Sequence, residues 1–272
     1  MNFTDVNPKI LLVNDKYVYA KTKREIPRRT RELIKSLKIP RVYTTLWVSS
    51  RDSDILAIAL DKNKKKQYYY SQEWISQQDS KKGERLKRFT RELPRLRRRI
   101  RRDLRLNDYS KKYVISNLLL ILELTCMRIG NMKYLKSNNS FGLTTLKREH
   151  VKLVKPHEIR FTFKGKHGVN QKKIIKDKRC YEFIRKMLDK RTEFLFEYEN
   201  KTTSRFHRIS SDDINSYLHE ILPGITCKDF RTYGANKWFA HYLRFHDNTK
   251  ALRLTSEKLG NTVNTLKKSY LV

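Results

Sequence analysis

The last thirteen residues of the chain contain a tyrosine that could act as a nucleophile. In the stretch from Gly260 to Val272, Gly260 is typical of a residue that ends a helix with a positive φ. Thr262 can then cap a short second helix, on which Leu266 and Tyr270 lie four residues apart on one face. Aromatic residues at helical spacing usually belong to a core. Tyr270 is therefore a candidate nucleophile only if other residues could serve it at a phosphate.

Two arginines upstream, Arg128 and Arg231, have the side chain that such chemistry needs. Attack at phosphorus builds negative charge on the non-bridging oxygens. A guanidinium stays ionised and presents a planar fork of donors to them, and removing one preorganised donor commonly costs about a hundred- to a thousandfold in rate. We interpret these arginines and Tyr270 as parts of one phosphoryl-transfer site.

The charge of the chain indicates a polyanionic partner. Its formal net charge is +34, from 62 Lys and Arg against 28 Asp and Glu, which is far more than solubility requires. Membrane surfaces also attract cations, so charge alone does not choose the partner. No run of about 18 apolar residues occurs, and residues 1–5 lack a signal-peptide pattern. We therefore expect a soluble, intracellular protein without a membrane partner.

Neither a metal nor a nucleotide cofactor is indicated. The three cysteines are widely spaced, the seven histidines show no metal-ligand spacing, and the odd cysteine number fits reduced core residues. No Gly-x-x-x-x-Gly-Lys loop for ATP occurs. We expect no metal and no cofactor.

The elements that must position these residues differ along the chain. The first 78 residues contain extended, β-branched and aromatic runs that predict a small antiparallel sheet, at residues 9–13, 17–20, 41–48, 55–60 and 67–70. Residues 77–83 are polar and without periodicity, and they are the best candidate for a domain boundary. After them the pattern is mostly helical: an apolar stripe from Leu86 to Leu104 with an arginine-rich opposite face, and a helix over 114–124 that is apolar almost all round.

The remaining pattern predicts one hairpin and further helices. Residues 158–164 alternate like a strand, Gly165 to Gly168 can turn the chain, and residues 173–175 can return it, with Lys166 near the tip. Residues 178–200 and 211–222 are amphipathic and helical in pattern, and another helix opens at 228–234.

Four blocks in this order resemble the type IB DNA topoisomerases, in their compact poxvirus and bacterial-like form. The blocks are Arg128-x-Gly130-Asn131, Gly165-Lys166, the segment 228–233 and the terminal Tyr270, and the stretches 66–70 and 133–147 match as well. The resemblance covers the chain from about residue 40 to residue 272. It implies an α+β fold with a β-rich N-terminal domain, residues 1–78, and a mainly helical catalytic domain with a small hairpin, residues 79–272, forming a C-shaped clamp around duplex DNA.

The resemblance also implies the reaction. Tyr270 would attack a backbone phosphorus, form a 3′-phosphotyrosyl link and release a 5′-hydroxyl strand that rotates about the intact strand and then reseals the link. Positive and negative supercoils would both relax without ATP or metal, because the covalent intermediate keeps the bond energy. By the same analogy Lys166, assisted by Arg128, is the general acid for the leaving 5′ oxygen.

Asn261 departs from the family pattern, in which many relatives have a histidine nine residues before the tyrosine. An amide can donate a hydrogen bond to a non-bridging oxygen but supplies neither a proton nor a positive charge. We therefore expect a slower but active enzyme. Only Leu271 and Val272 follow Tyr270, which leads us to expect little packing around the tyrosine segment and mobility without DNA.

The positions that match DNA contacts in the family are Gln67, Tyr68, Tyr70, Lys133 and Tyr134. Such tyrosines can position a duplex at its phosphates, whereas only base-edge contacts give sequence preference. Each of the five could also be an ordinary surface or packing residue, and the tyrosines could belong to a stacking surface or to an edge strand beside a solvated lysine loop. Binding should weaken steeply with salt.

Two other functions compete with a topoisomerase. A tyrosine recombinase uses the same catalytic set, but it normally needs a partner-swapping segment after the tyrosine. An architectural DNA-packaging protein would explain the charge but not the retained Arg128, Lys166, Arg231 and Tyr270. We expect a topoisomerase that clamps double-stranded DNA as a monomer. The composition leans towards Lys, Asn and Ile, which is compatible with a large DNA virus that has an AT-rich genome. We therefore expect the protein to act in a virion or in the host cytoplasm, and the nucleus is a further candidate location.

Overall fold

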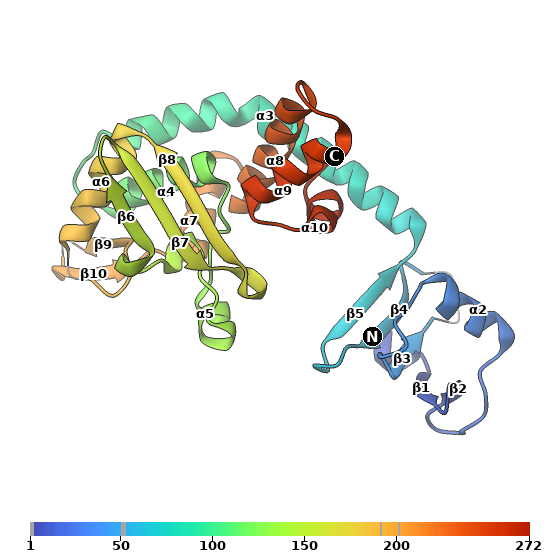
Figure 1. Cartoon of the computed structure of the whole chain (residues 1–272). Helices are drawn as coiled ribbons and strands as arrows, with labels where there is room; N and C mark the ends of the chain where they lie inside the picture. The colour runs from blue at the N-terminus through green and yellow to red at the C-terminus, as the bar shows by residue number, and fades with distance from the viewer. Residues whose placement is uncertain (1–2, 50–52, 191, 201) are drawn as a thin grey trace. The chain divides into compact units, whose positions relative to one another are not determined.

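The computed structural model describes residues 3–49, 53–190, 192–200 and 202–272. The chain divides into two compact units, Met1–Lys82 and Gly83–Val272. The first is built around an antiparallel sheet and the second is mainly helical (Figure 1). The predicted α+β class is confirmed. No helix among the described residues is long and apolar enough to cross a membrane.

The first unit is a five-stranded sheet in the order β2-β1-β3-β4-β5. The chain turns between β1 and β2 at Asn14 and Asp15, both with positive φ. The sheet packs its apolar face against Ile34 of a helix that the pattern did not predict. That helix was missed because it offers one buried residue among many charges. The elements are α1 Phe3–Val6, β1 Lys9–Val13, β2 Lys16–Tyr19, α2 Arg28–Ser36, β3 Thr45–Val48, β4 Ile55–Leu60 and β5 Lys66–Tyr70.

One long helix, α3 (Gln72–Asp103), runs through the point where the two units divide. Residues 77–83, expected to be an irregular boundary, are helical. The predicted apolar stripe is confirmed, with Phe89, Leu93, Leu96 and Ile100 buried. The arginine face is not wholly free, because Arg97 forms an ion pair with Glu123 of the next helix.

The second unit is organised around α4 (Lys111–Thr125), the helix predicted to be apolar all round. Ten of its residues are buried, and it contacts α6, α7, α8, β8 and β9. Ser110 caps its start by accepting from the Tyr113 backbone, and Cys126 ends it with a φ of 52°. The left-handed residue turns the chain out of the buried helix just before Arg128.

The other α-helices and strands of this unit are α5 Met132–Asn138, β6 Val151–Val154, β7 Glu158–Lys164, β8 Asn170–Lys176, α6 Lys178–Asp189, β9 Glu197–Asn200, β10 Arg205–Arg208, α7 Ser211–Ile221, α8 Cys227–Leu243, α9 Asn248–Leu259 and α10 Val263–Ser269, and short 3-10 helices lie at Leu143–Thr145, Arg148–His150 and Lys166–Gly168. The predicted hairpin is present as β7 and β8, with β6 paired beside it.

The helix predicted over 178–200 is wrong beyond Asp189. Lys190 has an extended backbone, and the guanidinium of Arg148 donates to the carbonyls of Leu188 and Lys190. These donors satisfy acceptors that a longer helix would have used itself. Residues 197–200 and 205–208 then pair as the antiparallel strands β9 and β10, while residues 191 and 201 lie outside the described part.

Candidate active site

Four of the five residues predicted to be catalytic come together in the second unit. Arg128 follows α4, Arg231 lies on α8, Asn261 stands in the turn between α9 and α10, and Tyr270 follows the end of α10. The helices α8, α9 and α10 pack against one another, with the C-terminus beside them (Figure 1). The site is thus assembled from segments more than 100 residues apart in sequence.

Asn261 joins the two arginines. Its Oδ1 accepts a hydrogen bond of 2.6 Å from the Arg128 guanidinium and one of 2.9 Å from the Arg231 guanidinium. Two positively charged guanidiniums therefore share one neutral acceptor, the amide oxygen of Asn261. The amide nitrogen of Asn261 is buried and has no hydrogen-bond partner among the described residues. The sequence predicted a donor at this position, and the orientation of the amide leaves that donor unused.

Arg231 is the most deeply buried cation of the group. It is 3% exposed and donates to the backbone carbonyls of Cys126 and, at 2.8 Å, of Leu259. Its Nε is buried without a partner, and within the described residues no carboxylate forms an ion pair with Arg231 or Arg128. A buried charge held only by neutral oxygens is costly, so this pair of guanidiniums favours an anionic ligand.

The start of α8 fixes where Arg231 lies. Asp229 accepts from the Thr226 backbone N–H at 2.7 Å, as in a capping box, and also from the guanidinium of Arg85 on α3. Further along α8, a Cβ at Gly234 would come within 2.2 Å of the Cys126 sulfur. Only glycine therefore lets α8 approach the end of α4 closely enough for Arg231 to reach the Cys126 carbonyl.

Tyr270 is held more firmly than the sequence led us to expect. Gly260 ends α9 with a φ of 67° and Thr262 caps α10, as predicted. Leu266 and Tyr270 are then 0% and 8% exposed in a shared apolar cluster. The Asn236 side chain of α8 donates to the Tyr270 carbonyl at 2.8 Å and accepts from the Val272 N–H at 3.2 Å. The expectation of sparse packing was wrong, because α8 supplies contacts that the sequence around Tyr270 does not reveal.

The arginines change the acidity of the tyrosine. Burial alone raises the pKa of Tyr270, but Arg231 and Arg128 outweigh burial, and the net pKa lies below the usual value. The Arg231 guanidinium carbon is 5.2 Å from the centre of the ring. Conversely, burial and then Arg128 lower the pKa of Arg231. The cluster thus favours the phenolate, which is the nucleophilic form.

Lys166 is the predicted catalytic residue that the structure does not bring into this cluster. It lies at the tip of the β7–β8 hairpin, is exposed, and its side chain makes no hydrogen bond or ion pair with any described residue. A different lysine of the same hairpin, Lys173, is 6% exposed, and burial, followed by Arg231, lowers its pKa to about 7. Sequence reasoning missed Lys173, although an alternating strand that buries Ile175 also buries the position two residues earlier.

The residues expected to contact DNA lie on both units. On β5, Gln67 donates to Asp61 at 2.9 Å, Tyr68 is 46% exposed, and Tyr70 stacks on Trp74 with ring centres 3.9 Å apart. β5 is an edge strand of its sheet.

On the second unit, Lys133 and Tyr134 are exposed on α5, with Tyr134 60% exposed. Tyr68, Lys133 and Tyr134 thus present exposed side chains to a ligand, whereas Tyr70 is half-buried and stacked on Trp74. Their role in binding stays a prediction.

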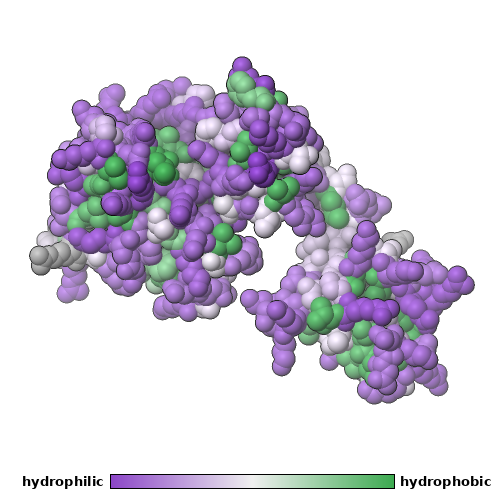
Figure 2. All heavy atoms as spheres, viewed as in Figure 1, coloured by the Kyte–Doolittle hydropathy of each residue, from purple (hydrophilic) through white to green (hydrophobic). Residues whose placement is uncertain are grey.

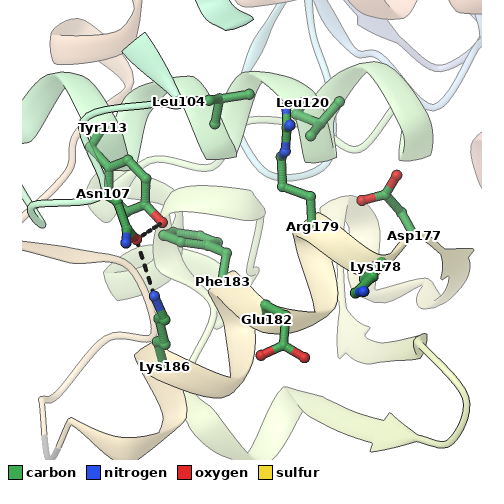
Figure 3. A pocket seen from close by; sticks show the side chains of 10 residues that line it. All are labelled: Leu104, Asn107, Tyr113, Leu120, Asp177, Lys178, Arg179, Glu182, Phe183 and Lys186. Carbon is green, nitrogen blue, oxygen red and sulfur yellow. Dashed lines mark hydrogen bonds between the residues drawn. The ribbon is translucent and has the colours of Figure 1, made fainter. Parts of the chain in front are cut away.

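The wider surface is dominated by polar side chains. On the face seen in Figure 2, hydrophilic residues cover most of both units and apolar residues form only small patches. A pocket of about 640 Å³ opens beside α4 and α6, where Tyr113 and Lys186 both donate to Asn107 (Figure 3). Its lining contains acidic and basic residues but none of the predicted site residues. No cluster of three His, Cys, Asp or Glu side chains suited to a metal occurs in the described ranges.

Comparison with known proteins gives a consistent result. Residues 64–269 match the family described as the catalytic core of eukaryotic DNA topoisomerase I. The chain is 31% identical to DNA topoisomerase 1B of Acanthamoeba polyphaga mimivirus, over 94% of this chain and 82% of that protein. It is 26% identical to DNA topoisomerase 1B of vaccinia virus (strain Copenhagen), over 88% and 79%. A solved structure of the XerH site-specific recombinase bound to difH overlays with a TM-score of 0.41 at 15% identity, covering 76% of this chain and 54% of that one, a similarity too low to support conclusions.

The pKa values of two buried tyrosines, Tyr270 and Tyr217, are shifted in opposite directions, and titration can test this. With [ζ-¹³C]tyrosine, we expect the NMR signal of Tyr270, assigned with Tyr270→Phe, to titrate below pH 10, because the arginines favour the phenolate. The signal of Tyr217 should titrate near pH 12, since burial raises its pKa to about 12 beside Asp103. Titration of Tyr270 at or above the exposed tyrosines would contradict the electrostatics of the site.

Proposed function

The chain belongs to the type IB DNA topoisomerases, and from this premise we propose that Tyr270 is the nucleophile that cuts one DNA strand. The observation that carries the proposal is the shared acceptor of the two arginines. Arg128 and Arg231 meet at one neutral oxygen, Arg231 and Asn261 each keep a buried donor without a partner, and the ring of Tyr270 lies against Arg231. A phosphoryl group would supply the acceptors and the negative charge that this arrangement lacks.

In the proposed cleavage step Tyr270 Oη, as the phenolate, attacks the phosphorus of a DNA phosphodiester. A bond forms between Oη and phosphorus, and the bond from phosphorus to the 5′ oxygen breaks. The phenolic proton leaves to solvent beforehand, which the lowered pKa of Tyr270 favours. Arg128 and Arg231 stabilise the charge that grows on the non-bridging oxygens. The product is a 3′-phosphotyrosyl link and a free 5′ end.

Lys166 is proposed to protonate the leaving 5′ oxygen, with Arg128 assisting. An alkoxide is a poor leaving group, so a positioned acid contributes about 10²–10⁴-fold. The exposed position of Lys166 on the hairpin tip requires that DNA draw the tip towards the scissile phosphate. Religation reverses the steps, with the 5′ hydroxyl returning its proton to Lys166 as it attacks phosphorus.

Asn261 is proposed to change partners when DNA binds. In the free protein its oxygen accepts hydrogen bonds from both guanidiniums. A phosphoryl oxygen would compete for these donors, and the unpaired Nδ2 could donate to another. The amide would then contribute one hydrogen bond without a charge, which supports the expectation of a slower but working enzyme.

The wider assembly is part of the same proposal. Residues 1–78 are proposed to contact double-stranded DNA through Gln67, Tyr68 and Tyr70, and residues 79–272 to contact it through Lys133 and Tyr134 beside the catalytic cluster. The stacked rings of Tyr68, Tyr70 and Trp74 and the exposed Tyr134 support contact with nucleic acid. We also propose a monomer that clamps the duplex and works in the host cytoplasm or nucleus or in the virion, consistent with the viral relatives.

Relaxation of plasmid DNA tests the function. With EDTA and without ATP, the wild-type protein should relax both positively and negatively supercoiled plasmid, and Tyr270→Phe should relax neither. Arg231→Lys should be slower by about a hundred- to a thousandfold, because lysine lacks the planar fork. The matched controls are Tyr242→Phe, near the end of α8, and Arg244→Lys, directly after it. Relaxation by Tyr270→Phe, or formation of Holliday junctions by the wild type, would contradict the proposal.

The role of Lys166 can be isolated with a modified substrate. Lys166→Ala should cleave ordinary DNA about 10²–10⁴-fold more slowly than the wild type. Replacing the 5′-bridging oxygen of the scissile phosphate by sulfur should restore its rate, because a thiolate leaves without being protonated. Lys164→Ala, the same charge change on the same hairpin, should behave like the wild type on both substrates. An equal defect of Lys166→Ala on the two substrates would exclude a role as general acid.

A further inference from the structure

The hairpin that carries Lys166 also presents two polar side chains to the interior. Along β8, burial alternates, and the inward positions are occupied by Gln171, Lys173 and Ile175, at 5%, 6% and 6% exposure. A lysine at an inward strand position is unfavourable unless its ammonium group has partners. The contacts of the Lys173 ammonium group must therefore offset the cost of burying it.

Both polar side chains bind the end of α9. Lys173 Nζ donates to the carbonyl of Lys258, and Gln171 Nε2 donates at 3.4 Å to the carbonyl of Gly260. The carbonyl between them, of Leu259, accepts from Arg231 at 2.8 Å. The last carbonyls of a helix lack partners within the helix and attract cations. Three successive carbonyls are thus held by donors from β8 and α8.

Gln171 fits against the turn that follows. Gly260 has a φ of 67°, and a Cβ there would lie 2.0 Å from the Gln171 side-chain oxygen. The next residue is Asn261, whose oxygen is shared by Arg128 and Arg231. Any shift of the three carbonyls would therefore move the acceptor on which both guanidiniums meet.

We propose that Lys173, together with Gln171, is a positioning residue of the cleavage reaction, which holds the α9–α10 turn so that Asn261 and the two arginines keep their register. This inference rests on the proposed function, because it assumes that the arginines hold the scissile phosphate. It links two parts of the site, since the strand that leads back from Lys166 also fixes the turn before Tyr270. A misplacement of about 1 Å can cost on the order of a hundredfold in rate.

The surroundings of Lys173 make this contact dependent on pH. The groups that face it are Arg231 on α8, Lys258 on α9, Cys126 at the end of α4 and Arg128 in the loop beyond. Burial, followed by Arg231, lowers the pKa of Lys173 to about 7. Lys173 is therefore an ammonium below about pH 7 and a neutral amine above it, and the ammonium donates the stronger hydrogen bond to the Lys258 carbonyl. Positioning should weaken as the pH rises through about 7.

Single-turnover cleavage of a duplex from which the cut strand dissociates tests the inference. Lys173→Met should lower the rate at saturating enzyme about 10- to 100-fold, with DNA affinity within about twofold of the control. Lys172→Met is that control, because it removes the same charge from the exposed face of the same strand. Lys173→Arg, which keeps a charged donor, should recover most of the rate. Gln171→Met, which removes the neighbouring donor at nearly equal volume, should show a smaller loss of the same kind.

The pH profile separates positioning from a merely structural role. The second-order rate constant of cleavage reports protonation of the free enzyme. The ratio of the wild-type constant to that of Lys173→Arg should fall as the pH rises through about 7, because arginine stays charged. This comparison needs only variants that keep the cation, so it decides the question even if Lys173→Met does not fold.

The possible results are distinct. Equal rates for Lys173→Met and Lys172→Met, or a ratio that is flat from pH 6 to 8, would overturn the positioning role while wild-type cleavage upholds the proposed function. No covalent cleavage by folded wild type would overturn the proposed function and the inference with it.

Discussion

The structure depends on one amide oxygen that two guanidiniums share. In the second unit Arg231 is buried and Arg128 is half-buried, and Asn261 Oδ1 accepts from both guanidiniums. The other acceptors of Arg231 are backbone carbonyls, which are dipoles and not charges. The fold thus concentrates positive charge without neutralising it in the cluster. In the proposed function, a phosphoryl group of DNA would supply the missing negative charge.

The ends of the surrounding helices supply the acceptors that hold Arg231 in this position. The end of α4 turns at Cys126 and offers its carbonyl to Arg231, and Gly234 lets α8 come close enough to use it. The end of α9 offers the Leu259 carbonyl and then Asn261. Helix ends are where unpaired carbonyls are available, so two helix C-termini pointing at one region can hold a buried arginine without any carboxylate. The same electrostatics favour the ionised form of Tyr270.

Much of this arrangement could be predicted from local sequence. The spacing of Leu266 and Tyr270, the capping by Thr262 and the apolar run of α4 each act within a few residues, and the structure confirms them. The resemblance to a family selected Arg128, Arg231 and Tyr270, which the structure brings together around Asn261. Contacts across the fold were not predictable in this way. The sequence does not show that the oxygen of Asn261 faces the arginines, nor that Asn236 of α8 binds the backbone at Tyr270.

The mistaken predictions have physical causes as well. The pattern over residues 178–200 predicts a helix because apolar residues recur at helical spacing, but Arg148 binds the carbonyls at which the helix ends, 40 and 42 residues further along the chain. Lys173 was not noticed because a lysine in a basic hairpin looks like a surface residue. Its burial follows from the alternation along β8, on which it lies two residues before the buried Ile175 and pairs with Phe161. The first error arises where a tertiary contact overrides the local pattern, and the second where the charge of a residue conceals the pattern.

Identification of the atom that becomes attached to DNA shows directly whether Tyr270 is the nucleophile. A duplex that traps the cleaved strand should be incubated with the wild-type protein in EDTA, the complex digested with protease, and the DNA-linked peptide sequenced by mass spectrometry. We expect a 3′-phosphate joined to Tyr270 and an equal amount of strand with a free 5′ hydroxyl. A nucleotide attached to any other residue, or a 5′-phosphate link to Tyr270, would contradict it.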